Sequence, residues 1–356
     1  MRRTARWAFL AVLACGVAYG AAPLFEETEL FVGGQDGINT YRIPALTCTK
    51  SGTVLAFCEG RIDNSEDGSP THLVLKRRTG NARAWNPMQI VLASRAGIAY
   101  MNPVPIIDRA NGAIHLLVNY YTHYDPHTEE RDAKVWLLTS RDEGAHWSKP
   151  VDLTPQVGAQ ELGPGIGIQL ESGRFVAPTY QGVIYSDDRG AHWRAGGRAP
   201  GPSSESQVVE LADGSLMRNT RGAPLRTITV SRDRGATWGE AWRDPALTDS
   251  RLWDGCQASL IRHTKNRLLF ANPADLRSRF LMTVRLSYDE GKTWPVSRLI
   301  RNGTGAYSSL TVFPDGTIGL MYETGNGFDE PFDFHVKIAF ARFNLEWLTD
   351  GRDRLP

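Results

Sequence analysis

Several short segments of this sequence hold side chains that can bind a carboxylate or move a proton. Arg42 lies in the segment Tyr-Arg-Ile-Pro, Glu205 in Ser-Ser-Glu-Ser-Gln and Tyr307 in Ala-Tyr-Ser-Ser. A guanidinium presents a planar fork that matches a carboxylate, and it stays charged at any working pH. A tyrosine, with an unperturbed pKa of ~10, needs a base and nearby positive charge before its oxygen can attack. Outside any wider context, such residues are more often a surface charge, a loop charge and a core tyrosine.

The elements that would position these side chains are marked by a segment, Ser-x-Asp-x-Gly-x-x-Trp, that occurs four times. The copies begin at Ser140, Ser186, Ser231 and Ser287. The Asp can accept hydrogen bonds from backbone N–H groups two residues on, and the Gly supplies a positive φ. The Trp brings a large apolar ring that pins the returning strand to its neighbours. Each segment therefore predicts the tip of a β-hairpin, an Asp box, and it predicts a fold rather than a chemistry.

The spacing of the boxes predicts a β-propeller of six blades, each with four antiparallel strands. The four serines lie 46, 45 and 56 residues apart, and a period of roughly 40–50 residues of strands is typical of propeller blades. A degenerate fifth copy ends at Trp85, and residues 307–343 remain for a sixth blade. We expect residues 30–32 to supply a strand to that last blade, which closes the ring and removes two sheet edges.

The pattern between the boxes is almost wholly that of strands, so the expected fold class is all-β. Short apolar or alternating runs are bounded by Gly, Pro, Asp and Asn, and no stretch carries a helical period of useful length. The runs lie at residues 53–57, 113–118, 134–138, 206–211, 226–230, 280–286 and 336–342.

The N-terminus and the composition limit the class of protein. Residues 1–20 combine two arginines, an apolar run and small residues at a cleavage site, which predicts a secretory signal and an exported protein. Cys15 is the lipid acceptor in the alternative interpretation, a lipoprotein signal. Residues 21–356 then form one propeller domain. The whole chain has 40 basic and 39 acidic residues, so it has no strong positive electrostatic field that would attract nucleic acid. An odd number of mature cysteines makes a disulfide framework unexpected: Cys48, Cys58 and Cys256.

The segments between the boxes resemble the exo-α-sialidases, propellers of bacteria and animals, over almost the full length of the predicted domain. In that family three arginines bind the carboxylate of sialic acid, and Arg42 of Tyr-Arg-Ile-Pro matches the first. Arg221, at the end of Asn-Thr-Arg, resembles the second, and alternation puts its competitor Arg218 on the other face. Arg279, which follows Asn-Pro-Ala, resembles the third, with Arg277 as its rival.

The resemblance implies a tyrosine nucleophile. Sialic acid carries its carboxylate on the anomeric carbon, so an attacking enzyme carboxylate would meet a like charge whereas a neutral phenol would not. Sialidases accordingly use tyrosine. Tyr307, in Tyr-Ser-Ser-Leu, matches the family's nucleophile, and Glu205, before Gln-Val-Val, matches its base.

The resemblance also implies a general acid, on a mobile loop five or six residues beyond Arg61. Asp67, which is followed by Gly, is the best match, and Glu66 is the main alternative, with Asp63 also on the loop.

The resemblance further implies residues that bind the sugar and residues that orient the sugar-binding side chains. Glu323 resembles the acid that holds the first arginine in orientation. Glu59 and Arg61 resemble residues that line the pocket. Gln257, Met101 and Asn102 resemble residues that contact the glycerol and acetamido groups, although a core or loop role fits these three as well.

The expected function is that of a retaining exo-α-sialidase that removes terminal sialic acids from glycans or glycoproteins. It needs no metal and no cofactor, and no obligate protein partner is indicated. A trans-sialidase, or an intramolecular one that yields an anhydro product, would share these residues. The alternative of another class is a non-catalytic Asp-box propeller that binds glycans, which would not need a nucleophile.

Overall fold

The computed structural model describes residues 21–80, 82, 84–95, 97–125, 127–128, 130–264 and 266–355. The predicted signal at residues 1–20, including Cys15, lies outside the described residues. The described chain is folded mainly into strands, as expected. The helical elements in this part of the chain are α1 (Thr154–Val157), α2 (Leu345–Leu348) and a 3₁₀ turn, η1 (Leu252–Asp254).

Four of the sheets contain four antiparallel strands each. The first three follow the chain strictly: β10 (Ile168–Gln169), β11 (Phe175–Thr179), β12 (Gly182–Ser186) and β13 (Arg194–Ala195); β14 (Ser206–Glu210), β15 (Leu216–Thr220), β16 (Leu225–Ser231) and β17 (Trp242–Thr248); β18 (Ser259–Thr264), β19 (Arg267–Pro273), β20 (Phe280–Ser287) and β21 (Val296–Thr304). The fourth joins the two ends of the chain: β22 (Ser308–Val312), β23 (Ile318–Thr324), β24 (Lys337–Phe343) and β1 (Phe25–Val32).

A fifth sheet has eight strands, formed by two antiparallel halves. The halves are joined by a single parallel pair, Thr71 with Ala99. Its strands are β2 (Thr40–Cys48), β3 (Val54–Arg61), β4 (Thr71–Arg78), β5 (Gln89–Leu92), β6 (Ala99–Ile107), β7 (Ile114–Tyr121), β8 (Lys134–Ser140) and β9 (Val151–Asp152). The fold is thus an all-β propeller, and the predicted count of six blades stays a prediction.

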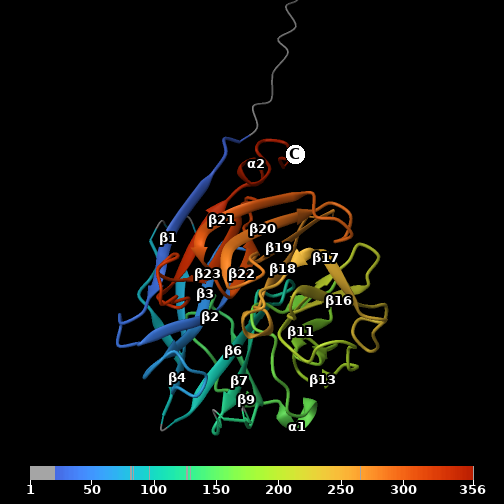
Figure 1. Cartoon of the computed structure of the whole chain (residues 1–356). Coiled ribbons are helices and arrows are strands. Elements are labelled where there is room, and N and C mark those ends of the chain that lie inside the picture. The colour runs from blue at the N-terminus through green and yellow to red at the C-terminus, as the bar shows by residue number, and fades with distance from the viewer. Residues whose placement is uncertain are drawn as a thin grey trace, which may run out of the picture.

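The sheets follow one another round the molecule in chain order, from blue through green and orange to red (Figure 1). First strands of neighbouring units contact one another at several places, for example β2 with β22 and β18 with β22. Side-chain oxygens bridge these inner strands, since Leu46 N donates to Ser309 Oγ and Leu310 N to Ser259 Oγ, both at 2.9 Å. The inner strands therefore lie side by side around the central axis.

The closing strand is β1, which confirms the role predicted for residues 30–32. It pairs with β24 from Phe25 opposite Phe343 to Val32 opposite Lys337, with one irregularity between Glu29 and Phe31. The N-terminal strand therefore covers the outer edge of the sheet that contains the C-terminal strands, and the blue strand lies beside the red ones in Figure 1.

The Asp boxes form the hairpin tips between the third and fourth strands of their units, as predicted. In the first box Ser140 Oγ donates to Asp142 Oδ1 at 2.9 Å and accepts from Gly144 N at 2.8 Å. Asp142 Oδ1 accepts from His146 N at 2.9 Å, so the donor is four residues on and not the predicted two. The glycine has positive φ in every box, and so does the residue before it, Glu143 (58°) in the first box, which the pattern did not predict.

The hydrophobic core lies between neighbouring sheets. One cluster joins Phe57 and Leu75 with Ile114 and Leu138, from the two halves of the eight-stranded sheet. Trp85 lies between β4 and β5, where a box is expected, and its ring packs edge-on against Phe340 at 5.2 Å. Among the described residues, Cys48, Cys58 and Cys256 are free cysteines. Among the described helices, none has the length and apolar character needed to cross a membrane.

Candidate active site

Most of the predicted site residues lie where the inner strands begin. Arg42 is in the third position of β2, Glu205 directly precedes β14 and Tyr307 directly precedes β22. Arg221 directly follows β15, the second strand of its sheet, and Arg279 directly precedes β20, the third strand of its sheet. Both therefore lie at this same end of their sheets. Because the inner strands surround the axis, residues far apart in the chain meet at this end.

The centre of the site is the hydroxyl group of Tyr307. This hydroxyl donates to Glu205 Oε1 and accepts from Arg221 Nη1 at 3.1 Å. Arg221 Nη1 also donates to Glu205 Oε2 at 2.7 Å, so the three side chains form a closed triangle. Tyr307 and Glu205 are 6% and 3% exposed, which keeps the triangle almost out of water.

Burial raises the pKa of Tyr307 well above its ordinary value, and the charge of Glu205 adds to the rise. Three arginines act in the other direction, namely Arg221, Arg279 and Arg42. The tyrosine is therefore neutral at working pH, with its proton already directed at a carboxylate. This proton can therefore leave only as the tyrosine oxygen forms a new bond.

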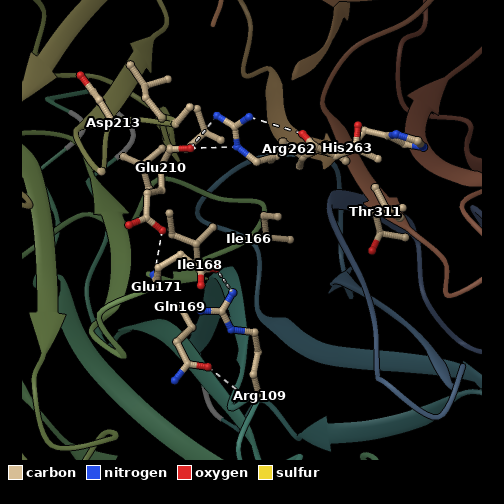
Figure 2. Close-up of a pocket in the computed structure, with 18 residues that line it drawn as sticks. Arg109, Ile166, Ile168, Gln169, Glu171, Glu210, Asp213, Arg262, His263 and Thr311 are labelled. Atoms are coloured by element: carbon tan, nitrogen blue, oxygen red, sulfur yellow. Dashed lines mark hydrogen bonds and ion pairs between the residues drawn. The ribbon is translucent and has the colours of Figure 1, made fainter. Parts of the chain in front are cut away.

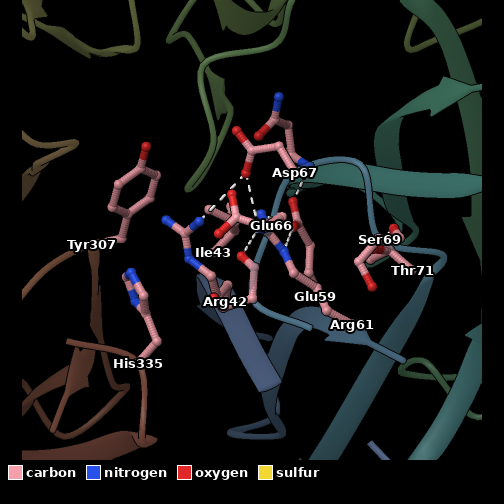
Figure 3. Close-up of polar contacts among 12 residues, drawn as sticks. Arg42, Ile43, Glu59, Arg61, Glu66, Asp67, Ser69, Thr71, Tyr307 and His335 are labelled. Carbon is pink, nitrogen blue, oxygen red and sulfur yellow. Dashed lines mark hydrogen bonds and ion pairs between the residues drawn. The ribbon is translucent and has the colours of Figure 1, made fainter. Parts of the chain in front are cut away.

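Arg42 lies between Tyr307 and Asp67 (Figure 3). Its guanidinium carbon is 5.4 Å from the centre of the Tyr307 ring, and its Nε is 3.5 Å from Glu323 Oε1. The same Glu323 oxygen accepts from Ile43 N at 2.7 Å. Ile43 has a φ of 57°, rare for a β-branched residue, at a bulge between Arg42 and Ala45. The bulge and Glu323 together turn Arg42 toward the site.

Glu323 is fully buried, and its pKa lies well below the ordinary value. Burial acts to raise that pKa, but Arg42 and then His335 lower it by more. Burial alone would lower the pKa of Arg42, but Glu323 and Asp67 raise it above the ordinary value. The Arg42–Glu323 pair is therefore charged throughout the working pH range.

The rival arginines lie elsewhere. Arg218 is fully buried within its sheet and donates to Tyr180 O at 2.7 Å, and burial lowers its pKa to about 10. Arg277 has a side chain that is 88% exposed and pairs with Asp275. Arg279 is 3% exposed, and its guanidinium carbon lies 5.5 Å from the centre of the Tyr307 ring. The structure therefore brings Arg42, Arg221 and Arg279 together around Tyr307.

Asp67 lies on the opposite side of Arg42 from Tyr307 (Figure 3). Its Oδ1 is 2.8 Å from Arg61 Nη1 and 3.4 Å from Arg42 Nη1, and 43% of its side chain is exposed. Burial acts to raise its pKa, but Arg61 and Arg42 lower the pKa below its ordinary value. Glu66 is exposed, and its backbone N–H caps a local turn by donating to Asn64 Oδ1. Of the two candidate acids, Asp67 is the one that contacts the arginines.

Glu59 and Arg61 are both fully buried and form the base of this loop. Arg61 donates through Nη2 and Nε to Glu59 Oε2, at 2.8 and 3.1 Å. Burial raises the pKa of Glu59, against the lowering effects of Arg61 and Asn102. Arg61 thus holds Asp67 from behind while its own charge is held by Glu59.

The remaining three predicted site residues are packed inside the protein. Gln257 is 1% exposed and its amide links backbone groups, because Oε1 accepts from Ser308 N and Nε2 donates to Pro164 O. Met101 is in a small buried cluster with Tyr121. Asn102, with a φ of 52°, donates from its backbone to Glu59 Oε1 at 2.9 Å. These residues hold the walls of the site.

Several residues around the site were missed because they lie in no segment for which the sequence showed a resemblance to the family. Tyr121 donates its hydroxyl to Glu161, whose other oxygen is 3.4 Å from Arg131. Burial raises the pKa of Glu161, and the charges of Asp67 and Glu205 add to the rise, against the lowering effect of Arg131. His335 Nδ1 lies 3.3 Å from Glu323 Oε2, and Trp253 lies over Arg279. The only signal for Trp253 in the sequence is the Gly that follows two residues later.

A cavity of about 800 Å³ lies away from these residues. It is lined where the inner strands end, by Ile168 of β10, Glu210 of β14 and Arg262 of β18 among others (Figure 2). None of the predicted site residues lines it. Within the described ranges, no group of three His, Cys, Asp or Glu side chains could hold a metal ion. The site at the strand starts brings together arginines, carboxylates and Tyr307.

The chain is similar to several known proteins in sequence and in fold. Residues 52–320 match the BNR repeat-like domain family. The chain is similar to a sialidase of Micromonospora viridifaciens, at 34% identity over 95% of this chain and 56% of that protein. It is also similar to an exo-alpha-sialidase of Aspergillus fumigatus, at 31% identity over 94% of this chain and 93% of that one. Among solved structures, the Hadza microbial sialidase Hz136 superposes with a TM-score of 0.76 at 27% identity, covering 91% of this chain and 69% of that one.

Proposed function

The chain belongs to the sialidase family of glycoside hydrolases, and from that premise we propose that it is an exported, retaining exo-α-sialidase. The single observation that carries the proposal is the triangle of Tyr307, Glu205 and Arg221, with Arg42 and Arg279 beside the tyrosine ring. The substrates are glycans or glycoproteins that end in sialic acid. The chain spans just over half the length of the Micromonospora protein, so the proposal concerns the propeller alone.

The three arginines bind the substrate carboxylate. A guanidinium stays charged at working pH, and its planar fork can donate two parallel hydrogen bonds to a carboxylate. Their positions around Tyr307 support this role, since the substrate carboxylate and the carbon to be attacked are joined by one bond. An anion held on the arginines therefore brings the anomeric carbon to the tyrosine oxygen.

Tyr307 attacks the anomeric carbon as its proton moves to Glu205. The hydrogen bond between them supports this step, because it sets the direction of the proton in advance. Arg221 stabilises the oxygen as negative charge develops there. The bond from the anomeric carbon to the glycosidic oxygen breaks as the new bond to Tyr307 forms.

Asp67 gives its proton to the departing oxygen. In the structure Arg61 and Arg42 lower the pKa of Asp67, which does not suit an acid at rest. A substrate carboxylate on Arg42 would take up part of that positive charge, so the pKa of Asp67 would rise on binding. Asp67 then deprotonates a water that releases the sugar from Tyr307, which regains its proton from Glu205, and configuration is retained after two inversions.

The six-blade count is part of the same proposal. The eight-stranded sheet would contribute two blades, β2–β5 and β6–β9, since one parallel residue pair joins them. With the four separate sheets this makes six, each with its first strand at the axis.

The test is product analysis with 2,3- and 2,6-linked sialyl-lactose, followed by NMR from the first turnover. We expect free sialic acid, released first as the α anomer. A 2,3-difluorinated sialic acid should label the peptide that contains Tyr307. The variant Y307F should lose labelling and on the order of 10³-fold or more in kcat. The matched control is Y322F, because the hydroxyl of Tyr322, in β23, donates to Glu27 of β1, away from the site, and the activity of this variant should be unchanged.

Other products identify the alternatives. First release of the β anomer, or label on Glu205 or Asp67, would overturn the tyrosine mechanism. An anhydro sugar or a transferred sugar would identify an intramolecular or intermolecular trans-sialidase with the same residues. Binding of sialosides without turnover would identify a glycan-binding propeller.

A further inference from the structure

Trp253 is an exposed aromatic residue held in a strained backbone conformation. Its side chain is among the most exposed large apolar side chains of the described residues, at 56%. It has φ 53° and ψ 36°, and Asp254 follows with φ 52°. Bulky residues rarely occupy this left-handed region, and they persist there only where the surroundings impose it. A strained, exposed tryptophan beside a catalytic centre therefore calls for a physical reason.

The surroundings do impose this conformation, through Asp249. Its Oδ1 accepts from Ser250 N and from Cys256 N, both at 2.9 Å, so one carboxylate oxygen ties the two ends of the loop. Its Oδ2 is 2.7 Å from Arg226 Nη1, and both side chains are buried. The loop that carries Trp253 is thus closed at its base by a buried ion pair, and its tip has little freedom.

Trp253 contacts two of the three arginines around Tyr307. Arg221 Nη2 donates to the Trp253 carbonyl oxygen. The guanidinium carbon of Arg279 lies 4.7 Å from the centre of the indole, within the range of a cation–π interaction. Phe334 packs edge-on against the indole at 5.8 Å and supports it from the side.

The third arginine depends on these contacts more than the other two. Arg42 has Glu323 and Asp67 as ionic partners, and Arg221 has Glu205. No carboxylate in the described part of the chain pairs with Arg279, whose Nη2 donates to Gly255 O at 2.9 Å and whose buried Nε has no partner there. Gly255 belongs to the same loop as Trp253. The plane of the Arg279 guanidinium is therefore set by this loop and by the rings of Trp253 and Tyr307.

We propose that Trp253 is a positioning residue of the carboxylate clamp, which fixes Arg221 through its carbonyl and Arg279 through its ring. The proposal rests on the proposed function, since that function assigns both arginines to the substrate carboxylate. The strained backbone conformation lets the carbonyl oxygen of Trp253 contact Arg221 while its indole ring contacts Arg279. Loss of the ring frees Arg279 to turn, and the clamp then holds a carboxylate less well.

The experiment compares W253A and W253F with the wild type on paired substrates. Each pair consists of a sialoside with its free carboxylate and the methyl ester of the same sialoside, with lactose or an aryl group as the leaving group. W253A should lose roughly 3- to 30-fold in kcat/KM for the free acids, mainly through KM. The preference for acid over ester should fall by a similar factor, for both leaving groups alike. W253F keeps an aromatic face and should stay within about threefold of the wild type.

W242A is the matched control. Trp242 is likewise an exposed tryptophan, at 47%, but it lies in β17 opposite Ile228, on an outer strand. The preference of W242A for acid over ester should equal that of the wild type. An unchanged acid-over-ester preference in W253A would overturn the proposal. A loss confined to the lactose substrates would overturn it too, because it would mean that the ring contacts the leaving sugar.

Failure of the proposed function can be told apart from failure of this inference. If the wild type hydrolyses no sialoside, calorimetric titration with free sialic acid replaces the rate measurements. Weaker binding by W253A than by W253F would then still support the positioning role. Equal binding by the two variants, or no binding by the wild type, would overturn it.

Discussion

The two ends of the inner strands differ although both carry arginine–carboxylate pairs. At the starting end Arg42 is 11% exposed and shares Glu323, which is fully buried, with backbone groups of two strands. At the far end Arg109 pairs with Glu171 at 2.8 Å, closer than the 3.5 Å between Arg42 and Glu323, but the side chains of Arg109 and Glu171 are 53% and 83% exposed. An ion pair by itself therefore does not mark a site. Buried charges are costly unless they are paired, and their concentration at one end indicates that they serve a function there.

The lining of the far-end cavity points the same way. Its lining includes the aliphatic residues Ile166, Ile168 and Val208. Its two arginines are engaged: Arg109 with Glu171, and Arg262 with the Glu210 carbonyl (Figure 2) and with Glu290, which lies outside the lining. At the starting end, by contrast, three arginines converge on one tyrosine. Convergence of like charges, rather than the size of a cavity, distinguishes the starting end, which we propose to be the catalytic end.

The largest expected difference between the ends is in the response to arginine removal. R42A should lose roughly tenfold to a hundredfold or more in kcat/KM, because charge-assisted hydrogen bonds to the substrate carboxylate contribute about 1.5–3 kcal/mol each. R109A removes an exposed pair and should change the free energy of unfolding by less than about 1 kcal/mol, with activity unchanged. Steady-state kinetics and chemical denaturation of both variants measure this. Normal kcat/KM in a folded R42A protein would contradict the carboxylate role.

A smaller effect is expected in the pH dependence of the catalytic end. Arg61 and Arg42 lower the pKa of Asp67 in the free protein, and the acid form is the one needed. Because kcat/KM reports the free enzyme, it should fall as pH rises through the acid range. The fall in kcat should come at higher pH, since a bound carboxylate offsets the charge of Arg42. D67N should remove this fall with rising pH for aryl sialosides, because their leaving group needs little protonation. The same pKa in both profiles would rule out the coupling between Arg42 and Asp67.

The smallest effect on activity is expected at the rim, in the Asp boxes. D142A should leave kcat almost unchanged and lower the free energy of unfolding by about 0.5–2 kcal/mol, as for loss of a local cap. The pKa of Asp142 is lowered to about 2, first by the hydrogen bond from His146 N. A carboxylate with a lowered pKa stabilises the fold above its unfolded pKa of ~3.9, and that contribution is lost as pH falls toward 2. Denaturation at pH 6 and pH 2.5 should therefore show a difference between D142A and wild type that shrinks in acid. Loss of activity at full stability would mean that the boxes belong to the catalytic end.

Much of the fold could be predicted because it is written in local patterns. The boxes gave the hairpin tips, and each of the seven alternating runs overlaps an observed strand. The pairing of residues 30–32 with β24 followed from the need to cover a sheet edge. What local patterns did not predict was backbone detail, such as the positive φ of Glu143 and the donor four residues beyond Asp142.

The site was predictable only where its residues belong to distinctive segments. Arg42, Glu205 and Tyr307 each lie beside a recognisable motif, and the structure brings them together. Tyr121 and Glu161 meet across 40 residues of chain with no shared spacing. Trp253 depends on a loop conformation that Asp249 imposes through hydrogen bonds. Contacts of this kind come from the three-dimensional arrangement of blades and leave no periodic trace in one sequence.

The pairing of β1 with β24 also sets an order of events during synthesis. Leu24 N donates to Asn344 Oδ1, and these residues are 320 positions apart. β1 is thus made long before β24 and can pair with it only after the intervening strands have been made. Until then β1 lacks this partner strand and the ring stays open with exposed strand edges, a state that favours aggregation. This part of the chain is therefore an unclosed ring until β24 has been made.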